Sequence, residues 1–332
     1  MKAVILAGGK GTRLRPVTGG LPKPMAPLLG RPVMAHIIEL LRRNGITDIC
    51  ASLGYCPEPI VDYFGDGSAF GVHLRCHIEQ APLGTAGGVR ACMEGEQEPF
   101  LVISGDAVCD FDLAALIRRH LQDAPAVTIA LHPQADPLRY GTVLTDGDGR
   151  VLQLLEKPPW EKVVTDLVNT GIYVVSPQAM AQVPPDVPFD FARDLFPRLL
   201  AQGETLLGVL MAGYWCDIGT PLAYYQCCVD ALRGTLRLHS GWERTPEPEV
   251  RHKTRLSVAC GDRARTMRRL SEALMGAGTA FDDGVRITRE HCSMHVYPQA
   301  ERSAICIECA CSDAEFAETL ALTVEELVKC VR

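Results

Sequence analysis

The sequence predicts an α/β fold in which a doubly wound, mostly parallel sheet is followed by a small α+β C-terminal domain. Two observations indicate this fold. Short apolar runs alternate with amphipathic segments over residues 1–121, a pattern typical of parallel strands connected by helices. A polar, proline-containing stretch at 240–253 then precedes a separate set of helices and strands, as a linker between domains does.

The parallel sheet is predicted from four apolar runs, and its helices from the amphipathic segments that follow them. Strands are expected at 1–7, 46–53, 72–78 and 100–104. Helices are expected from Pro32 to Asn44, near 58–64, at 85–93 and at 113–121. Ligands of such sheets bind beyond the carboxyl ends of the strands, so the glycine-rich turn after Ala7 is expected to lie near Asp106.

The next part of the chain, from Val127 to Tyr173, is predicted to hold short strands joined by hairpins. The runs 142–145 and 151–155 flank an Asp-Gly-Asp-Gly segment at 146–149, which favours a hairpin turn over a metal-binding loop. Residues 195–200 and a segment from Pro221 are expected to be helical, and 214–219 to run from a strand into a loop.

These patterns predict a first domain at 1–235, a linker at 236–253 and a C-terminal domain at 254–332. In the C-terminal domain we expect a helix at 263–275, strands at 284–288, 292–297 and 304–311, and a helix at 313–331. Cys306, Cys309 and Cys311 lie near two histidines and invite a zinc interpretation. Neighbouring side chains of a strand face opposite sides, however, which favours small buried core residues.

The composition is that of an ordinary globular protein, with 332 residues, 47% hydrophobic and 22% charged. A formal net charge of −7 argues against a general nucleic-acid-binding protein, which needs a basic surface. No apolar run reaches the roughly 20 residues of a membrane-spanning helix, and the first run is too short for a signal peptide. We therefore expect a cytoplasmic protein without a membrane partner, whose 14 cysteines are reduced thiols.

Positive charge gathers near the N-terminus. Residues 1–38 contain no acidic side chain, and their basic ones are Lys2, Lys10, Arg13, Arg15, Lys23 and Arg31. A local cationic field within an acidic protein suits a small, highly anionic ligand. Lys2 and Arg31 are interpreted as ordinary surface charges.

A glycine-rich turn follows the first predicted strand, in Leu6-Ala7-Gly8-Gly9-Lys10-Gly11-Thr12-Arg13-Leu14. Glycines let backbone amides approach phosphate oxygens without interference from side chains. Two well-known phosphate-binding motifs do not fit. Val4 and Gly11 break the P-loop spacing, and Leu14 stands where a dinucleotide-binding motif needs its third glycine.

This turn, followed by Pro22-Lys23-Pro24, resembles the signature of the sugar-1-phosphate nucleotidyltransferase family. Within that family, its motifs are most similar to those of the mannose-1-phosphate guanylyltransferases. The resemblance continues in Pro82-Leu83-Gly84-Thr85-Ala86-Gly87, Ser104-Gly105-Asp106, Glu156-Lys157-Pro158, Asn169-Thr170-Gly171 and Trp215-Cys216-Asp217-Ile218-Gly219. It implies a Rossmann-like nucleotidyltransferase domain.

The resemblance also implies how the nucleotide is bound. The nucleotide-binding residues by similarity are Leu6, Ala7, Gly8, Gly9, Gly11, Thr12, Gln80, Gly84 and Thr85. Arg13 would bind the departing β- and γ-phosphates, for which its forked guanidinium is suited. Lys23 would stabilise charge on the α-phosphate. A second interpretation of Thr85 is that it caps the helix that follows it, and both can hold.

The resemblance assigns the metal and the sugar as well. Asp106 and Asp217 are expected to hold Mg²⁺, since proteins usually bind this ion through one or two carboxylates and substrate phosphates. Gly141, Glu156 and Asn169 are expected to contact sugar hydroxyls, and Lys157 the sugar phosphate. Outside these motifs, an aspartate after a strand is more often a turn or cap residue, and a Glu-Lys pair is usually a solvated one.

The implied function is transfer of a nucleoside monophosphate from an NTP to a sugar 1-phosphate with release of pyrophosphate. The expected substrates are GTP and mannose 1-phosphate, which give GDP-mannose. The alternatives are a heptose- or glucose-1-phosphate nucleotidyltransferase, or an inactive regulatory paralogue that senses nucleotide sugars. The presence of Arg13, Lys23, Asp106 and Asp217 favours an enzyme. A homodimer is one assembly open to it, and no nucleic-acid partner is expected.

The C-terminal region resembles the last domain of the phosphohexomutases, in its order of elements and in Asp283-Gly284-Val285-Arg286-Ile287. The phosphate-binding loop of that family is replaced here by the segment 297–303, in which only Pro298 is retained. Mutase activity is therefore expected to be absent. A role in dimerisation, stability or the sensing of an effector is expected instead.

Overall fold

The computed structural model describes residues 1–238, 252–274, 279–280, 284–289, 292–299, 303–311 and 314–331. By its packing the chain forms two compact units. The first comprises Met1–Gly11, Leu21–Met25 and Ile37–Asp217, and the second comprises Thr12–Gly20, Ala26–His36 and Ile218–Arg332. Most of the linker predicted at 236–253 lies outside the described residues, and its last two residues, His252 and Lys253, begin a strand.

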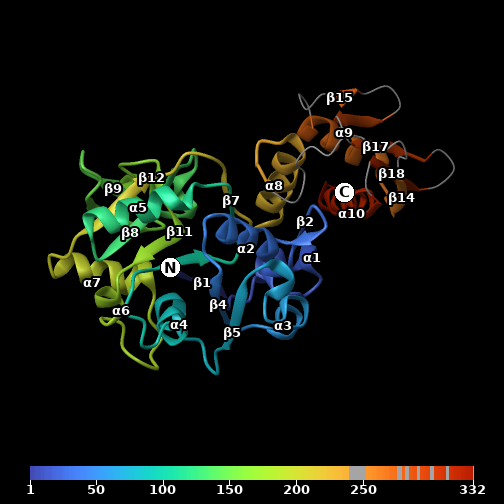
Figure 1. Ribbon diagram of the computed structural model, residues 1–332. Coiled ribbons are helices and arrows are strands. Elements are labelled where there is room, and N and C mark those ends of the chain that lie inside the picture. The colour runs from blue at the N-terminus through green and yellow to red at the C-terminus, as the bar shows by residue number, and fades with distance from the viewer. Residues whose placement is uncertain are drawn as a thin grey trace. The chain divides into compact units, whose positions relative to one another are not determined.

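The centre of the first unit is a parallel sheet, as the sequence predicts (Figure 1). Its strands are β1 (Lys2–Ala7), β4 (Asp48–Leu53), β5 (His73–Ile78) and β6 (Phe100–Ser104), in the order β6-β1-β4-β5. The pairs β1–β4, β1–β6 and β4–β5 all run parallel. Leu6 is paired with Ser104, so the carboxyl ends of β1 and β6 lie side by side. This confirms that the glycine-rich turn and Asp106 start from neighbouring strand ends.

The sheet continues with further strands to a total of nine. The added strands are β8 (Val127–Pro133), β9 (Gly141–Thr145), β10 (Val151–Glu156), β11 (Leu167–Val175) and β12 (Leu206–Leu210). β11 runs antiparallel to β6 and β8, so the sheet is mixed on this side. The predicted hairpin is confirmed, because β9 pairs antiparallel with β10 and the amide of Asp146 donates to the carbonyl of Arg150 at 2.9 Å.

The helices of the first unit lie at the predicted segments, except for a short helix at 177–180 that the sequence does not predict. They are α2 (Val33–Arg43, which begins in the second unit), α3 (Glu58–Phe64), α4 (Gly84–Cys92), α5 (Leu113–Asp123), α6 (Pro177–Met180) and α7 (Phe196–Ala201). Single 3-10 turns lie at Ser68–Phe70, Pro137–Arg139 and Trp160–Lys162. α4 packs on β1 and β4, and α5 packs on β8 and β11.

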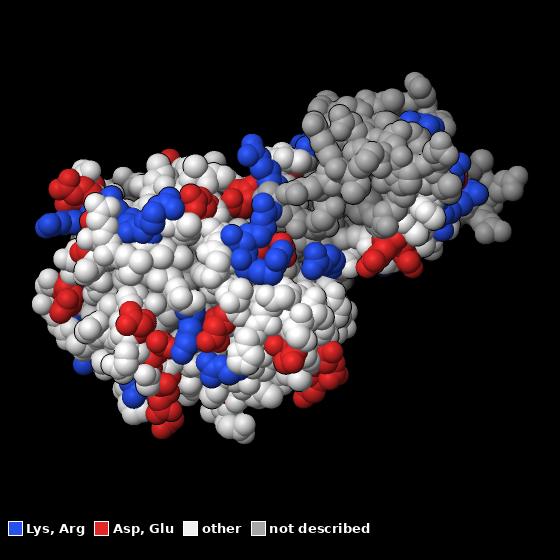
Figure 2. Space-filling view, in the orientation of Figure 1, with Lys and Arg blue, Asp and Glu red and all other residues white. Residues whose placement is uncertain are grey.

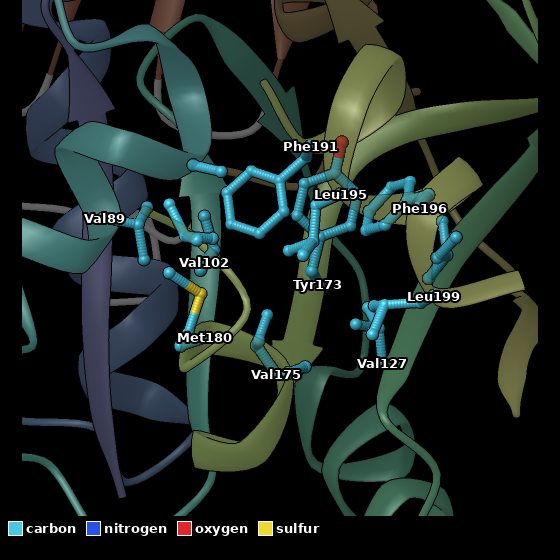
Figure 3. Close-up of a cluster of buried hydrophobic side chains, with 14 of the residues drawn as sticks. Val89, Val102, Val127, Tyr173, Val175, Met180, Phe191, Leu195, Phe196 and Leu199 are labelled. Atoms are coloured by element: carbon cyan, nitrogen blue, oxygen red, sulfur yellow. The ribbon is translucent and has the colours of Figure 1, made fainter. Parts of the chain in front are cut away.

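A cluster of buried side chains joins the sheet to α4, α6 and α7, as Figure 3 shows. At its centre, the ring of Tyr173 on β11 lies 5.0 Å from that of Phe191 and 5.2 Å from that of Phe196, centroid to centroid. Phe191 begins a π-helical turn, η6 (Phe191–Leu195), which leads into α7. The sequence predicts a helix here but not the π-helical turn, a feature that is frequent at functional sites.

The second unit includes two short N-terminal segments. A 3-10 turn, η1 (Thr12–Leu14), leads into α1 (Arg15–Thr18). Strands β2 (Pro27–Leu28) and β3 (Arg31–Pro32) form a hairpin. A further 3-10 turn of the first unit, η2 (Lys23–Met25), directly precedes this hairpin in the chain.

The rest of the second unit contains the predicted small α+β domain. Its antiparallel sheet has the order β14-β18-β17-β16-β15, with β14 (His252–Ala259), β15 (Thr279–Ala280), β16 (Val285–Arg289), β17 (Cys292–Pro298) and β18 (Ala304–Cys311). Its helices are α9 (Arg263–Leu274) and α10 (Ala314–Val331), and α8 (Pro221–Arg233) precedes them. Cys306, Cys309 and Cys311 are buried on β18, at the bounds predicted for this strand. The sequence does not predict β14.

The described part of the chain contains no helix that combines the length and the apolar character needed to cross a membrane. On the face drawn in Figure 2, basic and acidic side chains are intermixed and separated by wide neutral areas.

Candidate active site

The glycine-rich turn after β1 packs closely against Gly54, and its own Gly11 has a backbone conformation that favours glycine. The carbonyl oxygen of Gly8 accepts a hydrogen bond from the amide of Tyr55 at 3.2 Å, and a Cβ on Gly54 would lie 2.8 Å from the same oxygen. Gly11 has a φ of +54°, and a Cβ there would lie 3.0 Å from Cγ of Lys23. Close approach therefore requires glycine at Gly54, beside the start of the turn, and backbone conformation favours glycine at Gly11.

The last residues of β1 hold the loop that follows β6. The carbonyl oxygen of Leu6 accepts a hydrogen bond from the amide of Gly105 at 2.8 Å. A Cβ on Gly105 would lie 3.4 Å from Cβ of Ala7 and 3.2 Å from the ring of Pro24. Gly9, in contrast, is exposed, with no atom within 4 Å of the place where a Cβ would stand. The residues just before the turn, Leu6 and Ala7, therefore pack against the loop after β6, while Gly9 is exposed to solvent.

Lys23 brings together the two aspartates that the sequence predicts as metal ligands. Its ammonium forms an ion pair and a hydrogen bond with Asp106, and it lies 3.6 Å from Oδ1 of Asp217. The side chain of Lys23 is only 14% exposed, and those of Asp106 and Asp217 are 23% and 33% exposed. These three charged groups therefore form one largely desolvated cluster beside the glycine-rich turn.

A two-stranded ribbon carries both aspartates. β7 (Ala107–Cys109) follows Asp106 directly, and β13 (Trp215–Asp217) pairs with it antiparallel. In this register Asp217 lies opposite Ala107, next to Asp106. The sequence predicts the loop after β6 and the strand near 215, but not their pairing.

The carboxyl of Asp106 stays ionised in spite of its burial. Burial raises its pKa, but the charge of Lys23 and hydrogen bonds from Lys23 and Ser104 outweigh burial, so its pKa lies below the usual range. Two carboxylates around one cation also suit a Mg²⁺ ion. Among the residues that the structure describes, no group of three or more His, Cys, Asp or Glu side chains could hold a metal. A divalent ion held by Asp106 and Asp217 would therefore take its other ligands from substrate oxygens and water.

Asp110 fixes the ribbon, although the sequence patterns do not single it out. Its amide donates to the carbonyl of Tyr214 at 3.2 Å, and its carboxylate accepts from the amide of Tyr214 at 2.6 Å. The carboxylate also leaves no room for a side chain on Gly213. Asp110 thereby holds the strand that carries Asp217.

Three of the four residues predicted to bind the sugar lie together at neighbouring strand ends. Gly141 and Glu156 face each other across the β9–β10 pair. A Cβ on Gly141 would lie 2.8 Å from Oε2 of Glu156 and 3.7 Å from Cβ of Asn169. Asn169 is held by the amide of Gly171, which donates to its Oδ1 at 3.0 Å. The fourth residue, Lys157, is exposed, and its ammonium lies 3.7 Å from Oε1 of Glu156.

Tyr140 connects this group to β13. Its ring packs edge-on against Trp215, with the ring centroids 5.2 Å apart, and the next residue in the chain is Gly141. Burial and then the charge of Asp217 raise the pKa of Tyr140 to about 12. Tyr140 is therefore a neutral phenol at physiological pH, between the sugar-side residues and the ribbon.

A second connection runs through Ser104. A Cβ on Gly171 would lie 3.2 Å from Cβ of Ser104, whose hydroxyl donates to Asp106. The amide of the same Gly171 holds Asn169. Contacts through Tyr140 and through Gly171 and Ser104 thus connect Gly141, Glu156 and Asn169 with the two aspartates.

Glu79 lies beside the glycine-rich turn and is a residue that the sequence patterns did not single out. Its Oε1 accepts from the hydroxyl of Ser52 at 2.6 Å, and its Oε2 accepts from the amide of Leu83 at 3.1 Å. A Cβ on Gly8 would lie 3.5 Å from Oε1. Gln80, which the resemblance assigns to the base, is exposed next to it. The only feature of the sequence that could have indicated a role for Glu79 is its position directly after a predicted strand.

Gly84 and Thr85 lie at the start of α4 and face the segment 189–191. Gly84 has a φ of +72°, and a Cβ there would lie 2.7 Å from the carbonyl oxygen of Phe189. The hydroxyl of Thr85 donates to Asp190 at 3.0 Å and accepts from the amide of Phe191 at 3.0 Å. Since α4 begins without a side-chain cap, the interpretation of Thr85 as the cap of this helix is wrong. Its hydroxyl instead satisfies the first amide of the π-helical turn.

Thr12 and Arg13 belong to the second compact unit. Both are exposed on η1. Their contacts with a nucleotide stay predictions.

Comparison with known proteins places the chain among enzymes that act on nucleotides. The family model described as nucleotidyl transferase matches residues 2–233. A mannose-1-phosphate guanylyltransferase of Mycobacterium tuberculosis is 38% identical over 247 residues, which cover 72% of this chain and 68% of the relative. A UTP–glucose-1-phosphate uridylyltransferase of Synechocystis is 35% identical over 301 residues, which cover 86% of this chain and 76% of the relative.

Solved structures give the same picture of the fold. HddC from Yersinia pseudotuberculosis, complexed with GMP-PN, is 33% identical with a TM-score of 0.59, and the match covers 68% of this chain and 97% of HddC. A putative glucose-1-phosphate thymidylyltransferase from Bacillus anthracis is 25% identical with a TM-score of 0.63, and the match covers 70% of this chain and 95% of that protein.

Proposed function

Because this chain belongs to the nucleotidyl transferase family and its relatives are sugar-1-phosphate nucleotidyltransferases, we propose that it transfers the GMP part of GTP to mannose 1-phosphate. The products would be GDP-mannose and pyrophosphate. The observation that carries this proposal is the cluster of Lys23, Asp106 and Asp217 beside the glycine-rich turn.

The reaction brings two polyanions together, so the protein must supply positive charge and alignment. An oxygen of the sugar phosphate attacks the α-phosphorus of the NTP, and the bond from this phosphorus to the oxygen that bridges to the β-phosphate breaks. Lys23 is suited to stabilise the charge on the α-phosphate, because its ammonium is already largely desolvated and its backbone is restricted by prolines on both sides. A charge fixed in place before the reaction needs little reorganisation during it.

The glycine-rich turn would bind the triphosphate. Gly9 is exposed, and Gly8, Gly9 and Gly11 carry no side chains that would block the backbone amides. Gly8, Gly9 and Gly11 would donate these amides to phosphate oxygens. Arg13, exposed on η1, would bind the departing β- and γ-phosphates through its forked donors.

Asp106 and Asp217 would hold Mg²⁺. Both are carboxylates of one ribbon, and in the structure they already share a cation, the ammonium of Lys23. When bound, the ion supplies positive charge that offsets the negative charge of the phosphate oxygens.

The sugar would be bound by the side chains of Glu156 and Asn169, which offer hydrogen-bond acceptors and donors to its hydroxyls. Gly141 lies against both side chains, and its lack of a Cβ leaves room for the carboxylate of Glu156. Lys157, exposed at the end of β10, would bind the phosphate of the sugar.

The choice of GTP and mannose 1-phosphate is supported by the relatives rather than by the geometry. The guanylyltransferase of Mycobacterium tuberculosis has the higher identity of the two relatives described, and HddC was solved with GMP-PN. The second candidate reaction uses UTP and glucose 1-phosphate. It is supported by the uridylyltransferase of Synechocystis, whose match covers the larger share of this chain.

A screen of pyrophosphate release tests both candidates. The four common NTPs are combined with mannose 1-phosphate, glucose 1-phosphate and a heptose 1-phosphate, in the presence of Mg²⁺. We expect the highest kcat/KM with GTP and mannose 1-phosphate. Equal or faster turnover of UTP or dTTP with glucose 1-phosphate would replace the proposed substrates, and no release from any pair would reject the proposed reaction.

A further inference from the structure

The β2–β3 hairpin has a turn that its own sequence does not favour. Leu29 and Gly30 both have positive φ, 48° and 74°, as the tight turn of a two-residue hairpin requires. Glycine adopts this conformation readily, whereas leucine is strained in it. Such strain persists only where the surroundings hold the backbone in place. Leu29 is accordingly buried, with 4% of its surface exposed.

Two helices of the same compact unit hold this hairpin. On α10, Thr319 lies so close to the turn that a Cβ on Gly30 would stand 2.8 Å from its Cα. On α8, the fully buried Tyr224 donates a hydrogen bond from its hydroxyl to the carbonyl oxygen of Pro27. α8 and α10 also pack on each other. The last helix of the C-terminal domain is therefore part of the structure that fixes the hairpin.

The hairpin is joined to Lys23 by a short and stiff piece of chain. The 3-10 turn that begins with Lys23 is closed by a hydrogen bond from the amide of Met25 to the carbonyl of Pro22, at 2.8 Å. Ala26 follows at once, and its carbonyl accepts from the amide of Val33 at 2.9 Å. Prolines on both sides of Lys23 restrict the backbone further. A displacement of the hairpin would therefore be passed on to Lys23.

We propose that the C-terminal domain acts as a clamp in which α10, together with α8, fixes the β2–β3 hairpin and thereby positions Lys23. The proposal rests on the role of Lys23 in the proposed function. Gly30, Thr319 and Tyr224 are positioning residues, since they act through the hairpin. The clamp gives the C-terminal domain a part in the reaction that requires no ligand of its own.

The first test compares two neighbouring tyrosines of α8. Tyr224→Phe removes only the hydroxyl that binds the hairpin. Tyr225→Phe is the matched control, because the hydroxyl of Tyr225 lies 3.5 Å from the carbonyl of Arg269 on α9 instead. We expect kcat of Tyr224→Phe to fall about fivefold, the factor that one hydrogen bond is worth, with unchanged KM for both substrates. Tyr225→Phe should keep the wild-type kcat.

The second test compares two glycines of similar backbone conformation. Gly30→Ala places a methyl group against Thr319, at a φ of +74°. Gly45→Ala is strained in the same way at a φ of +77°, but no atom lies within 4 Å of its Cβ position. We expect Gly30→Ala to lower kcat by about tenfold or more and Gly45→Ala to leave it unchanged. If Gly30→Ala does not fold, Tyr224→Phe alone decides.

A double-mutant cycle separates positioning from stability. In a Lys23→Met background, Tyr224→Phe should have no further effect on the remaining kcat, because the group that it positions is gone. The same fivefold loss in both backgrounds would overturn the clamp. If the wild-type enzyme is active and Tyr224→Phe has the same kcat, the clamp would also be overturned, but the proposed function would stand. A wild-type enzyme that releases no pyrophosphate would overturn the proposed function itself.

Discussion

The ammonium of Lys23 lies between two carboxylates whose charges would otherwise repel each other. A divalent ion held by Asp106 and Asp217 would use the same carboxylate oxygens, so the two cations compete for them. If Asp106 and Asp217 held the ion, the ammonium of Lys23 would be free to contact the phosphates of the substrate. Lys23 is therefore expected to affect two properties: it would lower the affinity for the metal ion, and it would stabilise charge during the reaction.

Replacing Lys23 by methionine should separate its effect on metal affinity from its effect on the reaction. We expect kcat to fall by about 10²-fold or more, because a fixed positive charge at the α-phosphate is lost. We also expect Mg²⁺ to bind more tightly without substrate, because its competitor is removed. Steady-state kinetics and isothermal titration calorimetry measure the two effects. The control is Lys2→Met, which removes a surface ion pair with Glu96 and should change neither. Weaker metal binding by Lys23→Met would contradict the competition.

The pKa of Asp106 predicts how stability responds to acid. It is depressed in the folded protein, mainly because Lys23 outweighs burial, and is about 3.9 in an unfolded chain. A depressed pKa contributes stability above the unfolded value, and this contribution is lost as the pH falls toward the folded value. In Lys23→Met, burial dominates and raises the pKa of Asp106.

The free energy of unfolding should therefore fall more steeply for the wild type than for Lys23→Met as the pH is lowered below about 4. Urea denaturation at several pH values from neutral to acid measures the difference. An equal or steeper loss in Lys23→Met would show that Lys23 does not hold the pKa of Asp106 down.

Some residues of the candidate site could be predicted from the sequence, and others could not. Asp106 and Asp217 stand in sequence motifs beside or within strands, so their place next to each other could be predicted, while their role as Mg²⁺ ligands stays a prediction. Asp110 and Glu79 could not be predicted, because their roles consist of contacts with segments far along the chain. Thr85 was assigned to the wrong structural partner, since the π-helical turn that it binds leaves no periodic pattern in the sequence.

At the scale of elements, the β9–β10 hairpin positions the sugar-side residues. Gly141→Ala should push the carboxylate of Glu156 away, because the new Cβ would stand 2.8 Å from Oε2. We expect KM for the sugar 1-phosphate to rise about tenfold, as one hydrogen bond to a charged group is lost, with KM for the NTP unchanged. Gly147→Ala is the control on the same hairpin, since no atom lies within 4 Å of its Cβ position. A rise in KM for the NTP instead would place the nucleotide, not the sugar, at Glu156.

Elements with strong local patterns were predicted well. β6 and β18 have their predicted bounds, because β6 is a continuous apolar run that ends at Ser104 and β18 is apolar except for Glu308. β7, β12 and β14 were not predicted. β7 is three residues long and exists only through its pairing with β13, and β14 alternates exposed with partly buried residues at the edge of its sheet. Pairing between distant segments, rather than local propensity, creates such strands.

At the scale of the whole molecule, the division into units is the main feature that the sequence does not reveal. The α/β fold and the small C-terminal domain were expected. The membership of Ala26–His36 in the same compact unit as Ile218–Arg332 was not, since it depends on α8 and α10 packing on a hairpin that follows the signature turn. Contacts of this kind carry no periodicity and no motif.

The proposed function requires the triphosphate of an NTP to lie along the glycine-rich turn, held by Lys23 and by a divalent ion on Asp106 and Asp217. A crystal structure with a non-hydrolysable GTP analogue and Mn²⁺, read by the anomalous signal of the metal, tests it most directly. We predict one metal peak in contact with both aspartates, phosphate oxygens at the amides of Gly8, Gly9 and Gly11, and the ammonium of Lys23 at the α-phosphate. A bound analogue with its phosphates elsewhere, or a metal that contacts neither aspartate, would contradict the account.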